Sequence, residues 1–242
     1  MHQTKNIQSI SIIGLGNVGW HLALSLKQAG YEIKNIVSRN SESVSAPGEI
    51  PNTTIISDIN QIRDEPDLYL ITVQDSEIAS LAASLRGSDS IIVHTSGGID
   101  MSVFSGKSAS YGVFYPLQTF TKGTDMTYSD IPFLLEADSE DTLSVLKNVA
   151  EKISGKDRCV EAEERLSLHL AAVFACNFSN HMVSIASYLL KKENLDLELI
   201  QPLMKQTLKK LETLSPKEEQ TGPAIRNDMN TMNRHLELLA DE

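Results

Sequence analysis

The clearest indication of the fold is a glycine-rich hexapeptide near the start of the sequence, Gly14-Leu15-Gly16-Asn17-Val18-Gly19. It directly follows the apolar run from Ile7 to Ile13, and a helical pattern of apolar residues then covers Val18 to Ala29. Because strand, glycine spacing and helix occur together in this order, the stretch predicts a turn that holds the pyrophosphate of a dinucleotide.

Each glycine of this turn has a separate expected role. Gly14 permits the tight turn, Gly16 leaves room for the pyrophosphate, and Gly19 lets helix and strand pack closely. The amides of Asn17 and Val18 are expected at the positive end of the helix, where they can bind phosphate. The alternative is a glycine turn of the same shape that binds no ligand.

The end of the second predicted strand, Val37-Ser38-Arg39, indicates which dinucleotide binds. An NAD enzyme usually carries a carboxylate there, but Glu32 lies at the beginning of this strand. The Arg39 guanidinium and the Ser38 hydroxyl can instead bind a 2′-phosphate, which favours NADP. The alternative is that Arg39 is an ordinary solvated charge.

Two later strand ends are also expected to face the cofactor, because ligands of open parallel sheets lie outside the carboxyl ends of the strands. These ends carry Val73 and Gln74 in one case and Thr95 and Ser96 in the other. Simple turns explain both stretches equally well.

Short β-rich runs alternate with helical segments up to about residue 160, which predicts an α/β fold with a doubly wound, mostly parallel Rossmann sheet. After Glu161 only helical patterns remain, so an all-α C-terminal domain is expected. We place an NADP-binding domain at residues 1–158 and a helical substrate and dimerisation domain at 159–242. The expected strands are Ile7 to Ile13, Ile33 to Val37, Thr54 to Ser57, Leu68 to Val73, Ser90 to His94, Tyr111 to Phe114, Phe133 to Glu136 and Arg158 to Val160. The expected helices are Val18 to Ala29, capped at its end by Gly30, Glu77 to Leu85 with Ser76 as N-cap, Asp141 to Ile153, and Ala162 to Lys192, followed by helices broken near Asn194, at Pro202 and at 215–223.

The composition of the 242 residues excludes several classes of protein. A net charge of −11 argues against binding to nucleic acid or to anionic membranes, both of which need clustered cations. Cys159 and Cys176 are too few for a disulfide framework. We expect neither a signal peptide nor a membrane span, and therefore a cytoplasmic protein.

One face of the long predicted helix mixes polar groups into an apolar setting. His169, Val173, Asn177 and His181 recur every four residues, and Asn180 lies beside them. A substrate site and a structural hydrogen-bond network both explain these residues, whereas a metal site would need carboxylate or Cys ligands, which this face does not carry. We therefore expect no metal.

Near the C-terminus, Arg226 is a plausible clamp for a substrate anion. Asp228, Thr231 and His235 follow at helical spacing, with Asp228 close to an N-cap position. The structural alternatives are capping for Asp228 and a surface ion pair for Arg226.

Together these motifs resemble those of a group of bacterial proteins that join a Rossmann-like NADP oxidoreductase domain to a helical domain of uncharacterised function. The group is similar to the superfamily of 6-phosphogluconate dehydrogenase, β-hydroxyacid dehydrogenases, ketopantoate reductase and pyrroline-5-carboxylate reductase. The resemblance implies a helical domain that supplies part of the active site and the homodimer interface. The matching stretches are Gly14 to Gly19, His94-Thr95-Ser96-Gly97, Tyr115-Pro116-Leu117-Gln118-Thr119-Phe120, Asn177-Phe178-Ser179-Asn180, and Thr221-Gly222-Pro223 through Arg226 and Asp228.

The sequence departs from this superfamily at two positions that bear on chemistry. If Asn177 matches the superfamily's helical Asn, then Val173 holds the position of the catalytic Lys. His169 is the nearest residue able to exchange a proton near neutral pH. Tyr115 stands where the relatives more often carry His, but its hydroxyl can still donate a hydrogen bond.

These observations favour an NADP-dependent oxidoreductase that acts on a small carbonyl, imine or hydroxyacid. Its expected catalytic residues are His169 as proton donor, Thr95, Ser96 and Asn177 as orienting groups, and Arg226 as anion clamp. One alternative is a non-enzymatic module that binds NADP(H) and senses redox state, which the missing Lys favours. The other is a deazaflavin-dependent NADP reductase, in which little acid–base chemistry is needed.

Overall fold

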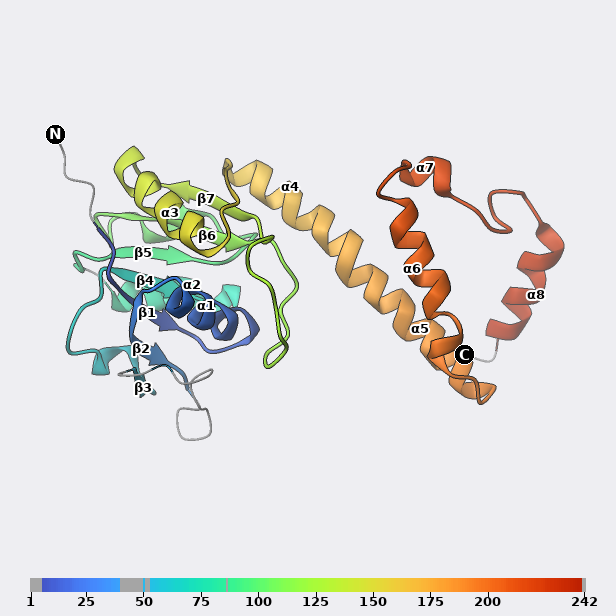
Figure 1. Ribbon diagram of the computed structural model, residues 1–242, viewed down its shortest axis with the longest axis horizontal. Coiled ribbons are helices and arrows are strands. Elements are labelled where there is room, and N and C mark those ends of the chain that lie inside the picture. The colour runs from blue at the N-terminus through green and yellow to red at the C-terminus, as the bar shows by residue number, and fades with distance from the viewer. Residues whose placement is uncertain (1–5, 40–49, 51–52, 86, 241–242) are drawn as a thin grey trace. The chain divides into compact units, whose positions relative to one another are not determined.

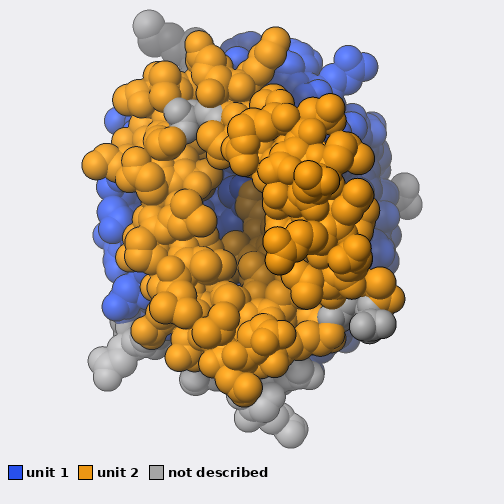
Figure 2. Space-filling view, turned by 90° about the vertical axis from the view of Figure 1, so that its right-hand side faces the viewer, with its two compact units in different colours: residues 1–177 blue, residues 178–242 orange. Residues whose placement is uncertain are grey.

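The computed structural model describes residues 6–39, 50, 53–85 and 87–240. Contacts between residues divide the chain into two compact units, Met1–Asn177 and Phe178–Glu242 (Figures 1 and 2). None of the described helices is long and apolar enough to span a membrane. The domain boundary after residue 158, which rests on where the strand patterns end, stays a prediction.

An eight-stranded sheet forms the centre of the first unit, in the order β3-β2-β1-β4-β5-β6-β7-β8 (Figure 1). All neighbouring strands are parallel except β6 and β7, which are antiparallel. The predicted doubly wound, mostly parallel sheet is confirmed. The strands are β1 (Ser9–Ile13), β2 (Glu32–Val37), β3 (Thr54–Ile56), β4 (Leu68–Ile71), β5 (Ile91–His94), β6 (Tyr111–Pro116), β7 (Phe133–Ala137) and β8 (Asp157–Cys159).

Helices cover both faces of this sheet, so both faces of the central strands are buried. In β1, Ile12 packs in the layer that holds α1 (Asn17–Gln28) and α3 (Glu140–Ile153). Its neighbour Ile13 packs in the layer that holds α2 (Asp75–Ser84) and the short 3-10 helix η2 (Met101–Phe104). A further 3-10 helix, η1 (Ile59–Gln61), follows β3.

The helix ends confirm one capping prediction and correct another. Gly30 ends α1 with a φ of 89°, and its amide bonds to the carbonyl of Lys27. Ser76 is not the N-cap of α2, because that helix already begins at Asp75, after Gln74. Asp75 and Glu77 both lie in its first turn, where negative charge interacts favourably with the helix dipole.

The long helix predicted over Ala162 to Lys192 is continuous but not uniform. It consists of α4 (Ala162–Ala172), a π-helical segment η3 (Val173–Phe178) and α5 (Ser179–Lys192). In a π-helix the hydrogen bonds run to the fifth residue back, so four-residue spacing no longer keeps side chains on one face. The single polar face expected for His169, Val173, Asn177 and His181 is therefore interrupted.

The second unit contains only helical elements and turns among its described residues. A break at Asn194, which has a φ of 56°, and another before Pro202 match the prediction. None of the described residues beyond Arg165 is buried, and Figure 2 shows a hollow at the centre of this unit. Its elements after α5 are η4 (Leu197–Leu199), α6 (Gln201–Lys210), α7 (Pro216–Glu219) and α8 (Met229–Leu239).

Candidate active site

The glycine turn between β1 and α1 has the strained and crowded geometry that only glycine accommodates. Gly14 has a φ of 102°, and its amide donates to the carbonyl of Val37 at 2.8 Å. A Cβ on Gly19 would lie 2.2 Å from the carbonyl oxygen of Gly14 and 2.5 Å from the hydroxyl of Thr72. Gly14 and Gly19 therefore let the turn and the helix pack directly on β1 and β4.

Gly16 differs from these two glycines, because nothing lies within 4 Å of where its Cβ would be. It precedes α1 without a side chain to cap the helix, and the first turn of α1 carries no acidic residue. The amides of Asn17 and Val18 are consequently left for a ligand, at the positive end of the helix. An open space next to such amides fits the pyrophosphate of a nicotinamide dinucleotide.

The loop after β6 is fastened to the beginning of α1. The Asn17 side-chain oxygen accepts a hydrogen bond from the amide of Lys122 at 3.0 Å. One turn later, the fully buried ring of His21 bonds through Nε2 to the carbonyl of Thr121 at 2.8 Å and through Nδ1 to the hydroxyl of Tyr128 at 3.1 Å. Asn17 thus uses its side-chain oxygen to hold this loop.

Beside the glycine turn, a cleft of about 300 Å³ opens at the carboxyl ends of β1, β2 and β4. Gly14, Arg39 and Val73 line it, and Arg39 is exposed. The Arg39 guanidinium forms an ion pair with Glu77 at 2.6 Å. Ser38 is partly buried, and its amide bonds to the carbonyl of Ile56 at 2.8 Å. Arg39 is therefore an exposed charge, as the alternative interpretation expected. It nevertheless lies at the rim of a cleft.

The loop after β5 contains the two predicted orienting residues. Thr95 is partly buried, and its hydroxyl bonds weakly to the carbonyl of Ile71 at 3.4 Å. Ser96 is buried, and its hydroxyl oxygen accepts from the amides of Gly98 and Ile99 at 3.1 and 3.0 Å. Ser96 therefore shapes the loop, whereas Thr95 has the more available hydroxyl.

His94 forms a hydrogen bond with the backbone of this loop and is expected to be neutral. Its Nδ1 accepts the amide of Ser96 at 3.2 Å, and the residue is fully buried. Burial, reinforced by the nearby Arg165 charge, lowers the pKa of His94 to about 4, although Asp100 opposes the shift. An uncharged His94 is therefore expected at neutral pH.

The most specific arrangement at this edge of the sheet joins β6 to α4. The hydroxyl of Tyr115, at the end of β6, lies 3.0 Å from Nδ1 of His169 on α4. The His169 ring also packs directly on Gly97, because a Cβ on that glycine would lie 2.6 Å from the ring's Cγ. The predicted proton donor and the Tyr that departs from the superfamily are therefore in direct contact.

A carboxylate lies near this pair. Asp75, the first residue of α2, has its Oδ2 3.8 Å from the position of a Cβ on Gly98. Burial raises the pKa of Tyr115, and the negative charge of Asp75 raises it further. The Tyr115 hydroxyl therefore keeps its proton at neutral pH.

The Tyr115–His169 pair can hold the imidazole in one orientation in both of its protonation states. A phenol both donates and accepts, so it can accept from Nδ1–H when the ring is charged and again after Nε2 has given up its proton. Nδ1 keeps its proton in both states, and the proton on Nε2 is the one that can be transferred. The pair can therefore hold the ring in place while Nε2 donates a proton to a ligand.

The remaining predicted residues lie in the π-helical segment or in the second unit. Asn177 is exposed and lies in the π-helical segment. Arg226 is exposed and belongs to the second unit. The prediction that Asp228 caps a helix is confirmed, since it is the N-cap of α8 and accepts the amide of Thr231 at 3.1 Å.

Sequence reasoning missed Arg165, the last buried residue of the described chain. It is 1% exposed, forms an ion pair with Glu136 of β7, and donates to the carbonyl of Ile99. The sequence did contain a signal for this residue. An Arg near the N-terminus of a predicted helix is electrostatically unfavourable, which suggests that it has a specific partner.

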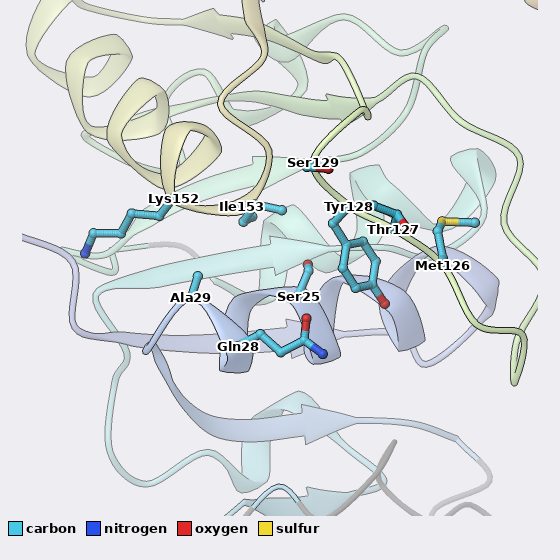
Figure 3. A pocket seen from close by; sticks show the side chains of 9 residues that line it. All are labelled: Ser25, Gln28, Ala29, Met126, Thr127, Tyr128, Ser129, Lys152 and Ile153. Atoms are coloured by element: carbon cyan, nitrogen blue, oxygen red, sulfur yellow. The ribbon is translucent and has the colours of Figure 1, made fainter.

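A second pocket of about 340 Å³ lies at the other end of α1 from the glycine turn (Figure 3). Figure 3 shows Gln28 and Tyr128 among its lining side chains, together with Lys152 near the end of α3. None of the predicted site residues lines it. Among the described residues, no group of three or more His, Cys, Asp or Glu side chains is arranged to bind a metal ion.

Two family models match the chain in sequence. Residues 9–98 match the model described as NADP oxidoreductase, coenzyme F420-dependent, and residues 131–242 match a domain of unknown function (DUF2520). No curated protein matches the sequence.

Solved structures also resemble the chain. A "putative NADP oxidoreductase" from Bacteroides fragilis is 39% identical, with a TM-score of 0.92 over 98% of this chain and 92% of that chain. A protein from Thermotoga maritima is 25% identical, with a TM-score of 0.68 over 93% and 87% of the two chains. A 1-pyrroline-5-carboxylate reductase from Streptococcus pyogenes shares the fold at 13% identity, with a TM-score of 0.68 over 98% and 96%.

Proposed function

The chain belongs to the same NADP oxidoreductase family as the Bacteroides fragilis protein, and we propose that it reduces a small carbonyl or imine with NADPH. The observation that carries this proposal is the Tyr115–His169 pair at the carboxyl edge of the sheet, the edge that also holds the glycine turn. Ligands of open α/β sheets bind outside this edge.

The glycine turn is the proposed site of the cofactor's pyrophosphate, with the amides of Asn17 and Val18 as donors. The cleft beside it, which Val73 lines and Gln74 borders, is proposed for the adenosine half. Arg39 and Ser38 at its rim are placed to bind a 2′-phosphate, which favours NADP over NAD. The cofactor, when bound, supplies or accepts the hydride.

His169 acts as the proton donor in this proposal. For each carbonyl reduced, a hydride forms the new C–H bond and the Nε2 proton of charged His169 forms the O–H bond. The imidazole becomes neutral and regains a proton from solvent. Tyr115 holds the ring throughout, and Thr95 is placed to orient the substrate, whereas Ser96 shapes the loop. Asn177 and Arg226 remain proposed substrate contacts.

The helices after Arg165 are proposed to form a homodimer. Every large apolar side chain that is exposed in the described residues lies between Leu166 and Leu239. Exposed apolar area of this extent marks a surface that another protein covers. A second copy is the simplest occupant, because most soluble oligomers are homodimers.

The test measures NADPH oxidation with a panel of keto acids, aldehydes and imines. His169→Ala should lower kcat by about 100-fold or more, as expected for loss of a general acid. The Kd for NADPH should stay unchanged, because His169 lies outside the glycine turn. Full turnover by His169→Ala would remove this residue from the mechanism.

A second candidate is hydride exchange between NADPH and a deazaflavin. The observation in its favour is the match of residues 9–98 to a family model described as coenzyme F420-dependent. Adding F420 to the panel separates the two candidates, because turnover with F420 alone and insensitivity to His169→Ala would favour this one. NADPH binding without turnover on any compound would instead favour a redox-sensing module.

A further inference from the structure

Arg165 connects three segments that are far apart in the sequence. It lies on the first turn of α4, forms an ion pair with Glu136 on β7, and donates through Nη2 to the carbonyl of Ile99 in the loop after β5. Both charged side chains are almost completely buried, with 2% of Arg165 and 11% of Glu136 exposed. A single guanidinium therefore fastens the beginning of α4 to a strand and a loop.

A gain in folding stability does not explain the buried Arg165–Glu136 pair well. A cation in the first turn of a helix interacts unfavourably with the helix dipole. The Nε atom of Arg165 is buried without a hydrogen-bond partner among the described residues, and burial raises the pKa of Glu136 although Arg165 opposes the shift. Apolar side chains of similar volume often replace such a buried pair without loss of stability. The pair is better explained by the geometry that it imposes.

The group whose position it controls is His169. Residues four apart on an α-helix lie on the same face, so His169 follows Arg165 along the side of α4 that faces the sheet. The His169 ring contacts the loop that Arg165 binds and a strand next to the one that Arg165 binds. Gly97, which the ring touches, belongs to the same loop as Ile99, and Tyr115 lies on β6, the strand paired with Glu136's strand β7.

We propose that Arg165 is a positioning residue, which holds the His169 imidazole against Gly97 and at hydrogen-bond distance from the Tyr115 hydroxyl. The positioning itself follows from the contacts, whereas its catalytic consequence rests on the function proposed for His169. Loss of Arg165 should let α4 shift relative to the loop and break the bond between Tyr115 and Nδ1.

The experiment follows the His169 ring by NMR in the full-length chain labelled with [¹⁵N]histidine. The chain has only six histidines, so His169→Gln assigns the signal, and Tyr115→Phe gives the reference for a lost hydrogen bond. Arg165→Met/Glu136→Met removes both charges together. We expect this double variant to unfold at nearly the wild-type temperature, to show the Tyr115→Phe signature at Nδ1, and to lose at least tenfold in kcat with an unchanged Kd for NADPH.

Two further variants separate the geometry of Arg165 from its charge and from the general effect of removing an ion pair. Arg165→Lys retains the charge but lacks the two guanidinium NH2 groups that bind Glu136 and Ile99 at the same time. It should therefore weaken the NMR signature of the hydrogen bond at His169 Nδ1 in a folded protein. The matched control is Lys156→Met/Asp130→Met, which removes an exposed pair at 2.7 Å and should leave the signature intact. A wild-type signature in both Arg165 variants would overturn the proposal. If the wild-type protein turns over no substrate, the proposed function fails, but the NMR comparison still decides this inference.

Discussion

The sheet of the first unit and the chain beyond Arg165 differ in whether their apolar side chains are buried. In the first unit, isoleucines, leucines and valines of the central strands are buried between helices on both faces of the sheet. Beyond Arg165, none of the described residues is buried, and all of the large apolar side chains that are exposed among the described residues lie there. The sheet therefore has its own closed core, whereas the chain beyond Arg165 leaves apolar surface of the kind that protein–protein contacts cover.

This difference assigns separate tasks to the two regions. The glycine turn, the Arg39 cleft and the Tyr115–His169 pair are all built from contacts within the first unit. Cofactor binding should consequently depend on the first unit alone, and association between copies on the helices.

The largest effect is expected from charges on the apolar side of α5. Met182 and Ile185 are exposed by 55% and 41%, and burying such a side chain stabilises by about 1.5–3 kcal/mol. Met182→Asp/Ile185→Asp should therefore weaken the proposed dimer more than about 1,000-fold, which analytical ultracentrifugation would measure. Ser184→Asp, at an exposed polar position of the same helix, is the control. A monomeric wild-type protein would show that these helices do not form the proposed dimer.

The next effect concerns the closed core and is pH-dependent. Folded His94 has a pKa of about 4, against 6.5 for the ordinary side chain, so only the unfolded chain takes up this proton between those values. Stability should therefore fall as the pH falls from about 6.5 to about 4, by roughly 3 kcal/mol in total. Urea unfolding across this range measures the slope.

His94→Gln should remove most of that slope, since Gln can still accept the amide of Ser96 but does not titrate. The matched control is His235→Gln, which replaces an exposed histidine on α8. An unchanged slope in His94→Gln would place the acid sensitivity elsewhere.

A smaller effect separates two glycines of the same turn. Gly19→Ala should cost about 2 kcal/mol, because its Cβ overlaps the backbone of Gly14. Gly16→Ala meets no atom and should cost no more than about 1 kcal/mol, through poorer helix capping. It should nevertheless raise the Kd for NADPH at least tenfold, as fluorescence titration would show. Equal Kd values for Gly16→Ala and wild type would argue against a pyrophosphate at this turn.

The smallest effect concerns cofactor choice. Arg39→Ala should weaken NADPH binding by about tenfold, the size of one charge-assisted hydrogen bond, and leave NADH binding unchanged. Glu77→Gln should have the opposite sign and strengthen NADPH binding by a few fold, because it releases Arg39 from its exposed ion pair. Equal losses for both cofactors in Arg39→Ala would contradict the 2′-phosphate assignment.

Local patterns in the sequence were sufficient to predict the sheet and the glycine turn. Strands such as β4 and β5 are short apolar runs, and the turn's glycines follow β1 directly. The same holds for Asp228, whose capping bond reaches only three residues along the chain. In each case the interaction lies within the window over which a pattern can be recognised.

The candidate site was only partly predictable, because its contacts are long-range. His169 was identified by its chemistry, but its bond to Tyr115 joins residues 54 positions apart. The Arg165–Glu136 pair depends on how α4 meets β7, which neither segment encodes alone. The π-helical segment at 173–178 also has no sequence signature of the kind used to predict helices. For this reason the polar face predicted from four-residue spacing was extended past the point where the α-helix ends.

The contact between Gly97 and His169 should make the residue types at these two distant positions depend on each other. With a methyl group at position 97, the imidazole at position 169 has no room, since their carbons would lie 2.6 Å apart. A related protein with a side chain at position 97 should therefore carry a smaller residue at position 169, and with it a different proton donor. Position 97 can thus indicate, from sequence alone, which relatives retain the chemistry proposed for this chain.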